Sequence, residues 1–516
     1  MANDDENFFD AIVVGTGLTE SILAAALSKA KYKVAHIDPN PYYGGNEASL
    51  SQDEFVKWGE QVSNGLHPAF SSHSGDSQVL PYSRQYSICL RPSIIPSLGP
   101  LITGLIASGV AKYSGFKLLN SVSIYAPDGT VKSVPGSKDA IFKSKDISLI
   151  EKRRLMRFLT FASGDFEDKP EIQGKEEQSF PEYLKSAYQL SDATVVVIAY
   201  ALAHCHRFHT SFIAAPALLP ALSREIWSFS IPPAVNGAVY VLGRPILSTA
   251  FHTPTSDEAQ SEPYIEMKLD DFPEVLKSRV LISSKVNKPP GTPVLPLEVS
   301  LPTDAFQTSF VSKVARCVAI LDKALSFHNT ETTADPDSPP SAKDSLDSTV
   351  LIFPPASLPG GSQTNAGTVL INGEASLSTP KQRWIVYIML PLTSPESESN
   401  VEALLRPYLD AALRLTGEPE AAPVQPLSTS FFFENQTPDQ GSSSSAPQDT
   451  PRHFLIPPLA YSTFPELPDS AAKIAEIVFH QAIRSLRALK GEASTEEEEV
   501  DFWPPMEPEE EDSDDE

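Results

Sequence analysis

The hydrophobic pattern at the start of the chain predicts three consecutive elements. Residues 8–14 (FFDAIVV) are almost continuously apolar, which is typical of a buried strand. Residues 18–30 carry apolar side chains at helical spacing, with small residues that permit close packing. Residues 33–38 (KVAHID) predict a second strand that ends on an acid. We therefore expect a strand, a helix and a strand over residues 8–38.

Gly15-Thr16-Gly17 joins the first strand to the helix, and Asp38 lies where a ribose-binding acid belongs. This order is the nucleotide-binding βαβ unit, but Glu20 replaces the third glycine of G-x-G-x-x-G. A carboxylate there is favoured by the helix dipole and repels a diphosphate. We expect Gly15, Gly17, Glu20 and Asp38 to be vestiges of a site that binds no cofactor. The alternative is that Glu20 points to solvent and tolerates a cofactor.

The loop after the second strand reads DPNPYYGG, with two prolines and two glycines that make it stiff and tightly turned. Adjacent tyrosines in such a loop offer large, rigid contact area, which suits protein binding. The loop therefore predicts a protein-binding surface that includes Tyr43, Gly44 and Gly45. The alternative is that one or both tyrosine rings pack inward.

Later segments predict further elements and a small helical subdomain. Ile147, Ile150, Phe158 and Leu159 predict one buried face of a helix, and residues 179–206 continue with apolar helices. Residues 329–367 are rich in Pro, Ser, Thr and Asp, which predicts a flexible insertion with a strand at 350–353. The other predicted helices are 101–108, 311–326 (amphipathic), 401–415 (with Pro407 as a bend) and 471–489, and the other predicted strands begin at Phe116 or cover 383–390 and 428–433.

Composition and charge narrow the possible partners. The chain has 516 residues, enough for two or three domains, and 47 prolines that suggest several linkers. Its net charge is −26, and 14 acids lie in residues 491–516, which we expect to be a disordered tail. An acidic body argues against nucleic acid and against stable docking on anionic lipid.

Sequence patterns for metal binding, disulfides and catalysis are weak. Cys89, Cys205 and Cys317 are scattered, which indicates no disulfide framework. His204 and His206 flank Cys205, but the segment is apolar and offers no further ligands, so we expect no metal. The acidic N-terminus does not suggest a signal peptide, and no apolar run is long enough to span a bilayer, so we expect a cytoplasmic protein.

Three blocks of sequence resemble the superfamily of Rab GDP-dissociation inhibitors and Rab escort proteins. They are GTGLTESILAAALS with HIDPNPYYGG, then SGVAKY with FK, and then FKSK with EKRRLMRFLTF. The third block, and VDFWPP near the end, are more similar to escort proteins. The resemblance implies an α/β fold with a flavoprotein-like, Rossmann-type domain of discontinuous sheet segments (residues 1–135 and 230–490). It also implies a helical prenyl-binding subdomain at 136–229.

The resemblance also implies a function. An escort protein binds unprenylated, GDP-bound Rab GTPases, presents them to the geranylgeranyltransferase α/β heterodimer, and holds the geranylgeranyl lipid of the product until transient membrane contact. It is an accessory component without catalysis or cofactor. The alternatives are a GDP-dissociation inhibitor that recycles prenylated Rabs and, from another class, an FAD-dependent oxidoreductase.

The resemblance assigns Rab contacts to Tyr43, Gly44, Gly45 and Tyr240. Tyr240 lies in a strand expected at 234–242 (AVNGAVYVL), and the alternative is an ordinary strand aromatic. Residues 212–233 depart from the family pattern, so neither Arg224 nor Glu225 is assigned.

Overall fold

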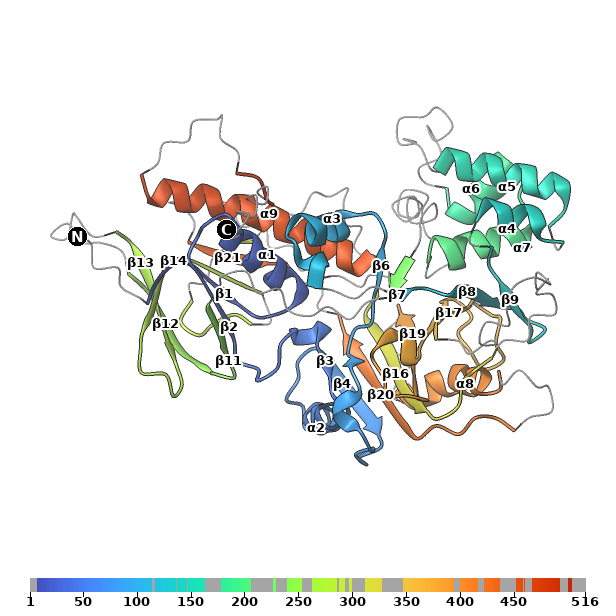
Figure 1. The fold of residues 1–516 in the computed structure, drawn as a ribbon, viewed down its shortest axis with the longest axis horizontal. Coiled ribbons are helices and arrows are strands. Elements are labelled where there is room, and N and C mark those ends of the chain that lie inside the picture. The colour runs from blue at the N-terminus through green and yellow to red at the C-terminus, as the bar shows by residue number, and fades with distance from the viewer. Residues whose placement is uncertain are drawn as a thin grey trace, which may run out of the picture.

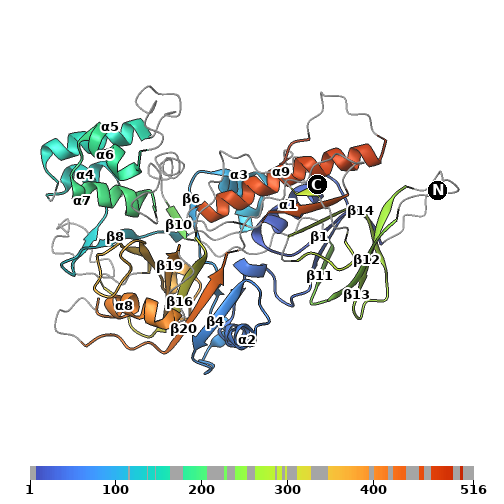
Figure 2. The same cartoon turned by 180° about the vertical axis from the view of Figure 1, so that it is seen from behind.

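The computed structural model contains two large sheets and a separate group of helices (Figures 1 and 2). It describes residues 7–113, 117–135, 137–145, 147–162, 178–205, 226–228, 239–252, 262–284, 287–292, 297–298, 311–326, 347–393, 400–415, 422–436, 452–457, 459, 466–491 and 500–503. Segments from both halves of the chain contribute to each large sheet.

The predicted βαβ unit forms the centre of the first sheet. β1 (Phe8–Val14) pairs in parallel with β2 (Val34–Asp38), and α1 (Leu18–Lys29) connects them, as predicted. The strand order is β11-β2-β1-β14-β13-β12, and β21 also pairs with β14 and β15. The remaining bounds are β11 Val239–Leu242, β12 Ile246–His252, β13 Tyr264–Leu269, β14 Leu276–Ser284, β15 Leu297–Glu298 and β21 His453–Ile456.

Two helices cover one face of this sheet, and the antiparallel strands close the other. α9 (Glu466–Leu489), which contains the predicted helix 471–489, packs beside α1 over β1 and β14. Residues 500–503 return to this layer, with the Phe502 ring 5.2 Å from that of Phe479. The Trp503 indole lies so close to Gly104 of α3 (Pro100–Ala107) that a Cβ there would be 2.9 Å from Nε1.

The second sheet has the order β4-β20-β16-β19-β18-β17-β8-β9. α8 (Val401–Leu413), which contains Pro407 in its interior, covers one face, and α2 (Gln52–Ser63) packs on the other. The strands are β4 Phe70–Gly75, β8 Ser121–Tyr125, β9 Val131–Ser133, β16 Lys313–Leu321, β17 Ser348–Phe353, β18 Gly367–Asn372, β19 Trp384–Leu392 and β20 Ser428–Asn435.

Two predictions for this region were wrong. Residues 311–326 do not form a helix, because β16 lies between β19 and β20 and is buried on both faces. Cys317 faces the α8 side and Val318 faces the α2 side. Because both faces of the strand are buried, its sequence is largely apolar and lacks the alternation of polar and apolar residues that would identify a strand. The flexible insertion does not extend to residue 367, since β17, the predicted strand, is followed by buried Leu358 and by β18. Residues 329–346 lie outside the described residues.

The helical subdomain lies beside β8 and β9 of the second sheet (Figures 1 and 2). Phe158, Phe180 and Tyr188 form its aromatic core. Phe158 is on the buried face as predicted, but Ile150 is 64% exposed, because the helix begins at Leu149 and its buried stripe runs through Leu155. The helices are α4 Lys138–Lys143, α5 Leu149–Ala162, α6 Phe180–Tyr188, α7 Asp192–Val196 and a π-helix Val197–Leu202.

Short elements connect these parts. β6 (Ile94–Pro96), β10 (Ile226–Ser228) and β7 (Lys117–Leu118) form a three-stranded sheet, and Phe116 lies outside the described residues. The other elements are β3 Ser49–Leu50, β5 Ile88–Cys89 and the 3-10 helices Gly45–Glu47, Ser83–Gln85, Val110–Tyr113 and Glu374–Ser376. Across the described parts of the chain, no helix is both long and apolar enough to cross a membrane.

Candidate functional site

The glycine turn after β1 is bonded to the end of β2. Gly15 has a φ of 104°, and its amide donates to the Ile37 carbonyl at 2.8 Å. Thr16 donates to Oδ2 of Asp38 from its amide at 2.8 Å and from its hydroxyl at 2.6 Å. The other oxygen of Asp38 accepts from the amide and side chain of Asn40. Asp38, predicted as a vestigial ribose acid, therefore serves to bind the turn and its own loop.

Glu20 fills the space above the two glycines. Its side chain is buried, with 7% exposed, and a Cβ on Gly17 would lie 2.7 Å from its Oε2. Burial, reinforced by the nearby Glu47 and Asp38 carboxylates, raises the pKa of Glu20 to about 8. The alternative in which Glu20 points to solvent is therefore wrong.

A second carboxylate occupies the N-terminus of α1. Glu47 accepts a hydrogen bond from the Leu18 amide at 3.3 Å, which is a donor that a bound diphosphate would use. With the Glu20 carboxyl filling the space above the glycines and the Glu47 carboxylate at the helix end, a dinucleotide diphosphate would meet two acidic side chains in place of free space and free amides. The residues present therefore do not fit a flavin or nicotinamide dinucleotide.

The loop from Asp38 to Gly45 folds back on the glycine turn. The Tyr43 hydroxyl donates to Ser21 Oγ at 2.8 Å, and the Gly44 amide donates to Thr16 Oγ1 at 3.0 Å. Gly44 has a φ of 108°, and a Cβ there would lie 2.8 Å from the Cα of Ala48. Only glycine fits this position without strain. The loop is thus held in one conformation by its hydrogen bonds to the glycine turn and to α1.

Tyr43 and Tyr240 meet at the edge of the sheet. β11 places Tyr240 opposite His36 of β2, and the two tyrosine ring centroids are 6.1 Å apart. His36 is buried, donates from Nε2 to the Gly15 carbonyl at 2.5 Å, and has its pKa lowered to about 4 by burial. Burial also raises the pKa of both tyrosine hydroxyls. Both residues are partly buried and partly exposed.

Pro41 and Leu242 lie beside the two tyrosines. We call these four residues, Pro41, Tyr43, Tyr240 and Leu242, the tyrosine surface. Leu242 is 36% exposed and lies two residues after Tyr240, on the same face of the strand. Pro41 is exposed, and a Cβ on Gly243 would lie 3.5 Å from its Cα. Sequence reasoning missed both residues, although the period of two along β11 could have found Leu242.

The other predicted candidates do not join this surface. Tyr42 is half-buried and packs against the core shared by the second sheet and the helical subdomain. This ring therefore packs inward, which is the alternative given for one of the two tyrosines. Arg224 and Glu225 lie outside the described residues. His204 is buried with its pKa lowered to about 4 by burial, and no group of three metal-binding side chains occurs among the described residues.

Part of the chain is similar to a known family. Residues 3–246 match the family model described as GDP dissociation inhibitor. The fold of a Rab GDI from Plasmodium falciparum superposes with a TM-score of 0.56 at 16% identity, covering 93% of this chain and 98% of that chain. The predicted flavoprotein-like α/β fold, as the GDI family has it, is thereby confirmed.

Relatives of this chain bear one recurring name, Rab proteins geranylgeranyltransferase component A. The Saccharomyces cerevisiae protein is 25% identical over 436 residues, covering 78% of this chain and 65% of the relative. The Drosophila melanogaster protein is 33% identical over 227 residues, covering 40% of this chain and 43% of the relative. The chain thus spans less than two thirds of each of these relatives, and its predicted resemblance to the escort branch is confirmed.

Proposed function

We propose that this chain is a Rab escort protein. It binds newly made, GDP-bound Rab GTPases, presents them to the geranylgeranyltransferase heterodimer and carries the prenylated product to membranes. The observation that carries this proposal is the tyrosine surface, built on a glycine turn whose cofactor space Glu20 fills. In this role the chain acts by binding its partners and presenting one to the other.

The tyrosine surface has the properties of a rigid contact area for a folded partner. Tyr43 is bonded to Ser21 and packed near Tyr240, so little side-chain entropy is lost when a partner covers it. Aromatic rings supported in this way are frequent anchors in protein interfaces. We place Tyr43 and Tyr240 at the centre of the Rab contact, with Pro41 and Leu242 beside them.

The helical subdomain offers a second surface, which we assign to the transferase. Phe142, Leu149 and Ile150 are 57%, 75% and 64% exposed, and exposed apolar groups of this size often mark protein interfaces. Phe142 lies near the end of α4, whereas Leu149 and Ile150 begin α5, and Lys152 connects the two helices by donating to the Phe142 carbonyl at 2.8 Å. Arg153 follows Ile150 by three residues and brings a positive charge to the same face.

The interior of the helical subdomain suits the geranylgeranyl chain. It is packed with aromatic and aliphatic side chains, and it contains a π-helix at Val197–Leu202, a rare conformation that often accompanies function. The Tyr200 hydroxyl is buried there without a hydrogen-bond partner among the described residues. We propose that the lipid enters between these helices.

Complex formation with purified proteins tests the proposal. The chain is expected to co-elute with GDP-loaded Rab on gel filtration. This complex is also expected to bind the transferase heterodimer. Tyr43→Ala should weaken the Rab complex, whereas Tyr264→Ala should not, because β13 lies four strands from β11. Equal loss with both variants would remove Tyr43 from the interface. Extraction of prenylated Rab from membranes without transferase binding would favour a GDP-dissociation inhibitor, and a yellow protein that bleaches on reduction would favour a flavoenzyme.

A further inference from the structure

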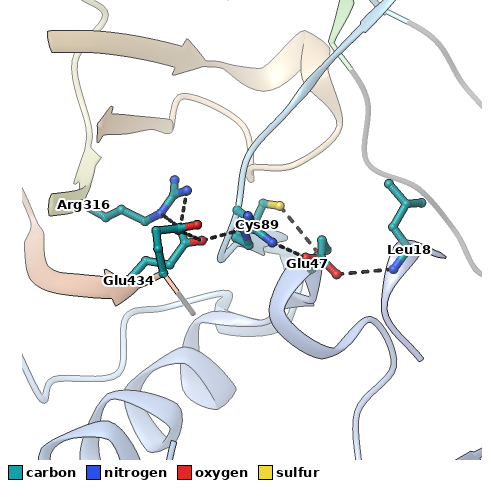
Figure 3. A network of polar contacts seen from close by, with 7 residues as sticks. Leu18, Glu47, Cys89, Arg316 and Glu434 are labelled. Carbon is teal, nitrogen blue, oxygen red and sulfur yellow. Dashed lines mark hydrogen bonds and ion pairs between the residues drawn. The ribbon is translucent and has the colours of Figure 1, made fainter. Parts of the chain in front are cut away.

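A chain of buried charges connects the glycine turn to the second sheet (Figure 3). Glu47 pairs with Arg91, whose Nη1 lies 2.7 Å from Oε1 of the carboxylate. Arg91 Nε lies 2.9 Å from Oε1 of Glu434 on β20. Glu434 in turn accepts from Arg316 of β16 at 2.6 Å. This series of charges therefore runs from α1, through the segment after β5, to the neighbouring strands β20 and β16 of the second sheet.

The four charges alternate in sign and balance one another. Arg91, Arg316 and Glu434 have side chains only 7%, 7% and 5% exposed, so each depends on its partners for stabilisation. The two arginines hold the pKa of Glu434 below its usual range, and the adjoining carboxylates raise the pKa of Arg91. Neutralising Glu47 would leave an excess positive charge within the protein.

Glu47 stands directly after the loop that bears Tyr43. Its carboxylate bridges the Leu18 amide and Arg91, and its own amide donates to the Gly44 carbonyl at 2.9 Å. The start of the loop is fixed separately, through Asp38 and Thr16. The loop is thus attached at one end to the glycine turn and at the other end, through Glu47, to both α1 and the second sheet.

We propose that Glu47 is a positioning residue for partner binding, which fixes the 38–45 loop and thereby the orientation of Tyr43. Its carboxylate accepts from the N-terminus of α1, where a bound anion would otherwise lie. Through Arg91 and Glu434, it also fixes the loop that bears Tyr43 relative to the second sheet. The effect on Rab binding rests on the proposed function, whereas the effect on the loop does not.

The first arm of the test uses the full chain without any partner. 3-Fluorotyrosine is placed at Tyr43, and its ¹⁹F resonance is compared in the parent, in Glu47→Gln and in Glu402→Gln. Glu402 is a matched control, because its carboxylate pairs with Arg406 at the surface of α8. We expect a shifted or broadened resonance in Glu47→Gln only. An unchanged resonance would overturn the proposal. If Glu47→Gln does not fold, Glu47→Asp, which keeps the charge but shortens its reach, must shift the resonance.

The second arm measures the dissociation constant for a GDP-loaded Rab. We expect Glu47→Gln to weaken binding about tenfold, and the Glu47→Gln/Tyr43→Ala double variant to bind no more weakly than Tyr43→Ala, because both changes act through one side chain. Additive losses would overturn the positioning role. If the parent chain binds no Rab while the ¹⁹F result holds, the proposed function fails and the positioning of the loop by Glu47 stands.

Discussion

Glu20→Gln should make the protein more stable at alkaline pH. In the folded chain the Glu20 carboxyl is buried above Gly15 and Gly17, and its pKa rises from 4.5 to about 8. Below pH 4.5 the carboxyl is protonated in both the folded and unfolded chain. Between these values only the folded state keeps the proton, so the stabilising contribution is lost as pH rises through the folded pKa.

The size of the effect follows from the shift. One pKa unit corresponds to about 1.4 kcal/mol, so the folded protein loses up to about 5 kcal/mol from this group between pH 4.5 and 8. Glutamine has a similar shape and no charge, so the variant should lack this loss. His36, His204 and His453 change stability in the opposite direction between pH 4 and 6.5, because burial lowers the pKa of each. They are present in both proteins and cancel in the difference.

Urea unfolding of both proteins at pH 5.5, 7 and 8.5 measures this difference. We expect the variant to gain stability over the parent as pH rises, while Glu60→Gln on the exposed side of α2 shows no pH-dependent difference. A difference between Glu20→Gln and the parent that stays constant across this range would refute the argument that the Glu20 carboxyl is desolvated.

Other predictions concern the loop and the C-terminus. Tyr43→Ala should weaken Rab binding by more than about 1 kcal/mol, whereas Tyr43→Phe, which keeps the ring and loses the hydroxyl with its hydrogen bonds to Ser21 and Tyr240, should cost less; equal dissociation constants for Ala, Phe and the parent would contradict this. Gly44→Ala should lower stability to urea by about 1–3 kcal/mol, because its Cβ would collide with Ala48; a stability equal to the parent's would mean that the loop relaxes. Phe502→Ala should cost about 2 kcal/mol through lost packing on α9, and an unchanged melting temperature would count against that contact.

The local patterns of the chain predicted its local elements well. The βαβ unit follows from an apolar run, a glycine turn and a second strand, all within residues 8–38. The β19 strand and the α9 helix were equally accessible, because each has a long and regular apolar pattern. Residues 313–321 misled the prediction, since a strand buried on both faces has no polar side to reveal its period.

Long-range contacts account for what the sequence did not reveal. The resemblance identified Tyr43 and Tyr240 individually. Their proximity depends on the pairing of β11 with β2, which are far apart in the sequence. Glu47 was missed altogether, because its partners Arg91 and Glu434 are far away in sequence. From the sequence, Glu20 was expected only to repel a diphosphate. The fold shows in addition that its carboxyl fills the space over Gly15 and Gly17.

Prenylation of a Rab in vitro tests whether this chain presents Rab GTPases to the transferase. The purified geranylgeranyltransferase heterodimer, geranylgeranyl diphosphate and a GDP-loaded Rab are incubated with and without this chain, and lipid transfer is followed with time. We expect transfer that depends on the chain, falls with Tyr43→Ala and is retained with Tyr264→Ala. Transfer at the same rate with and without the chain would show that it is not an escort protein.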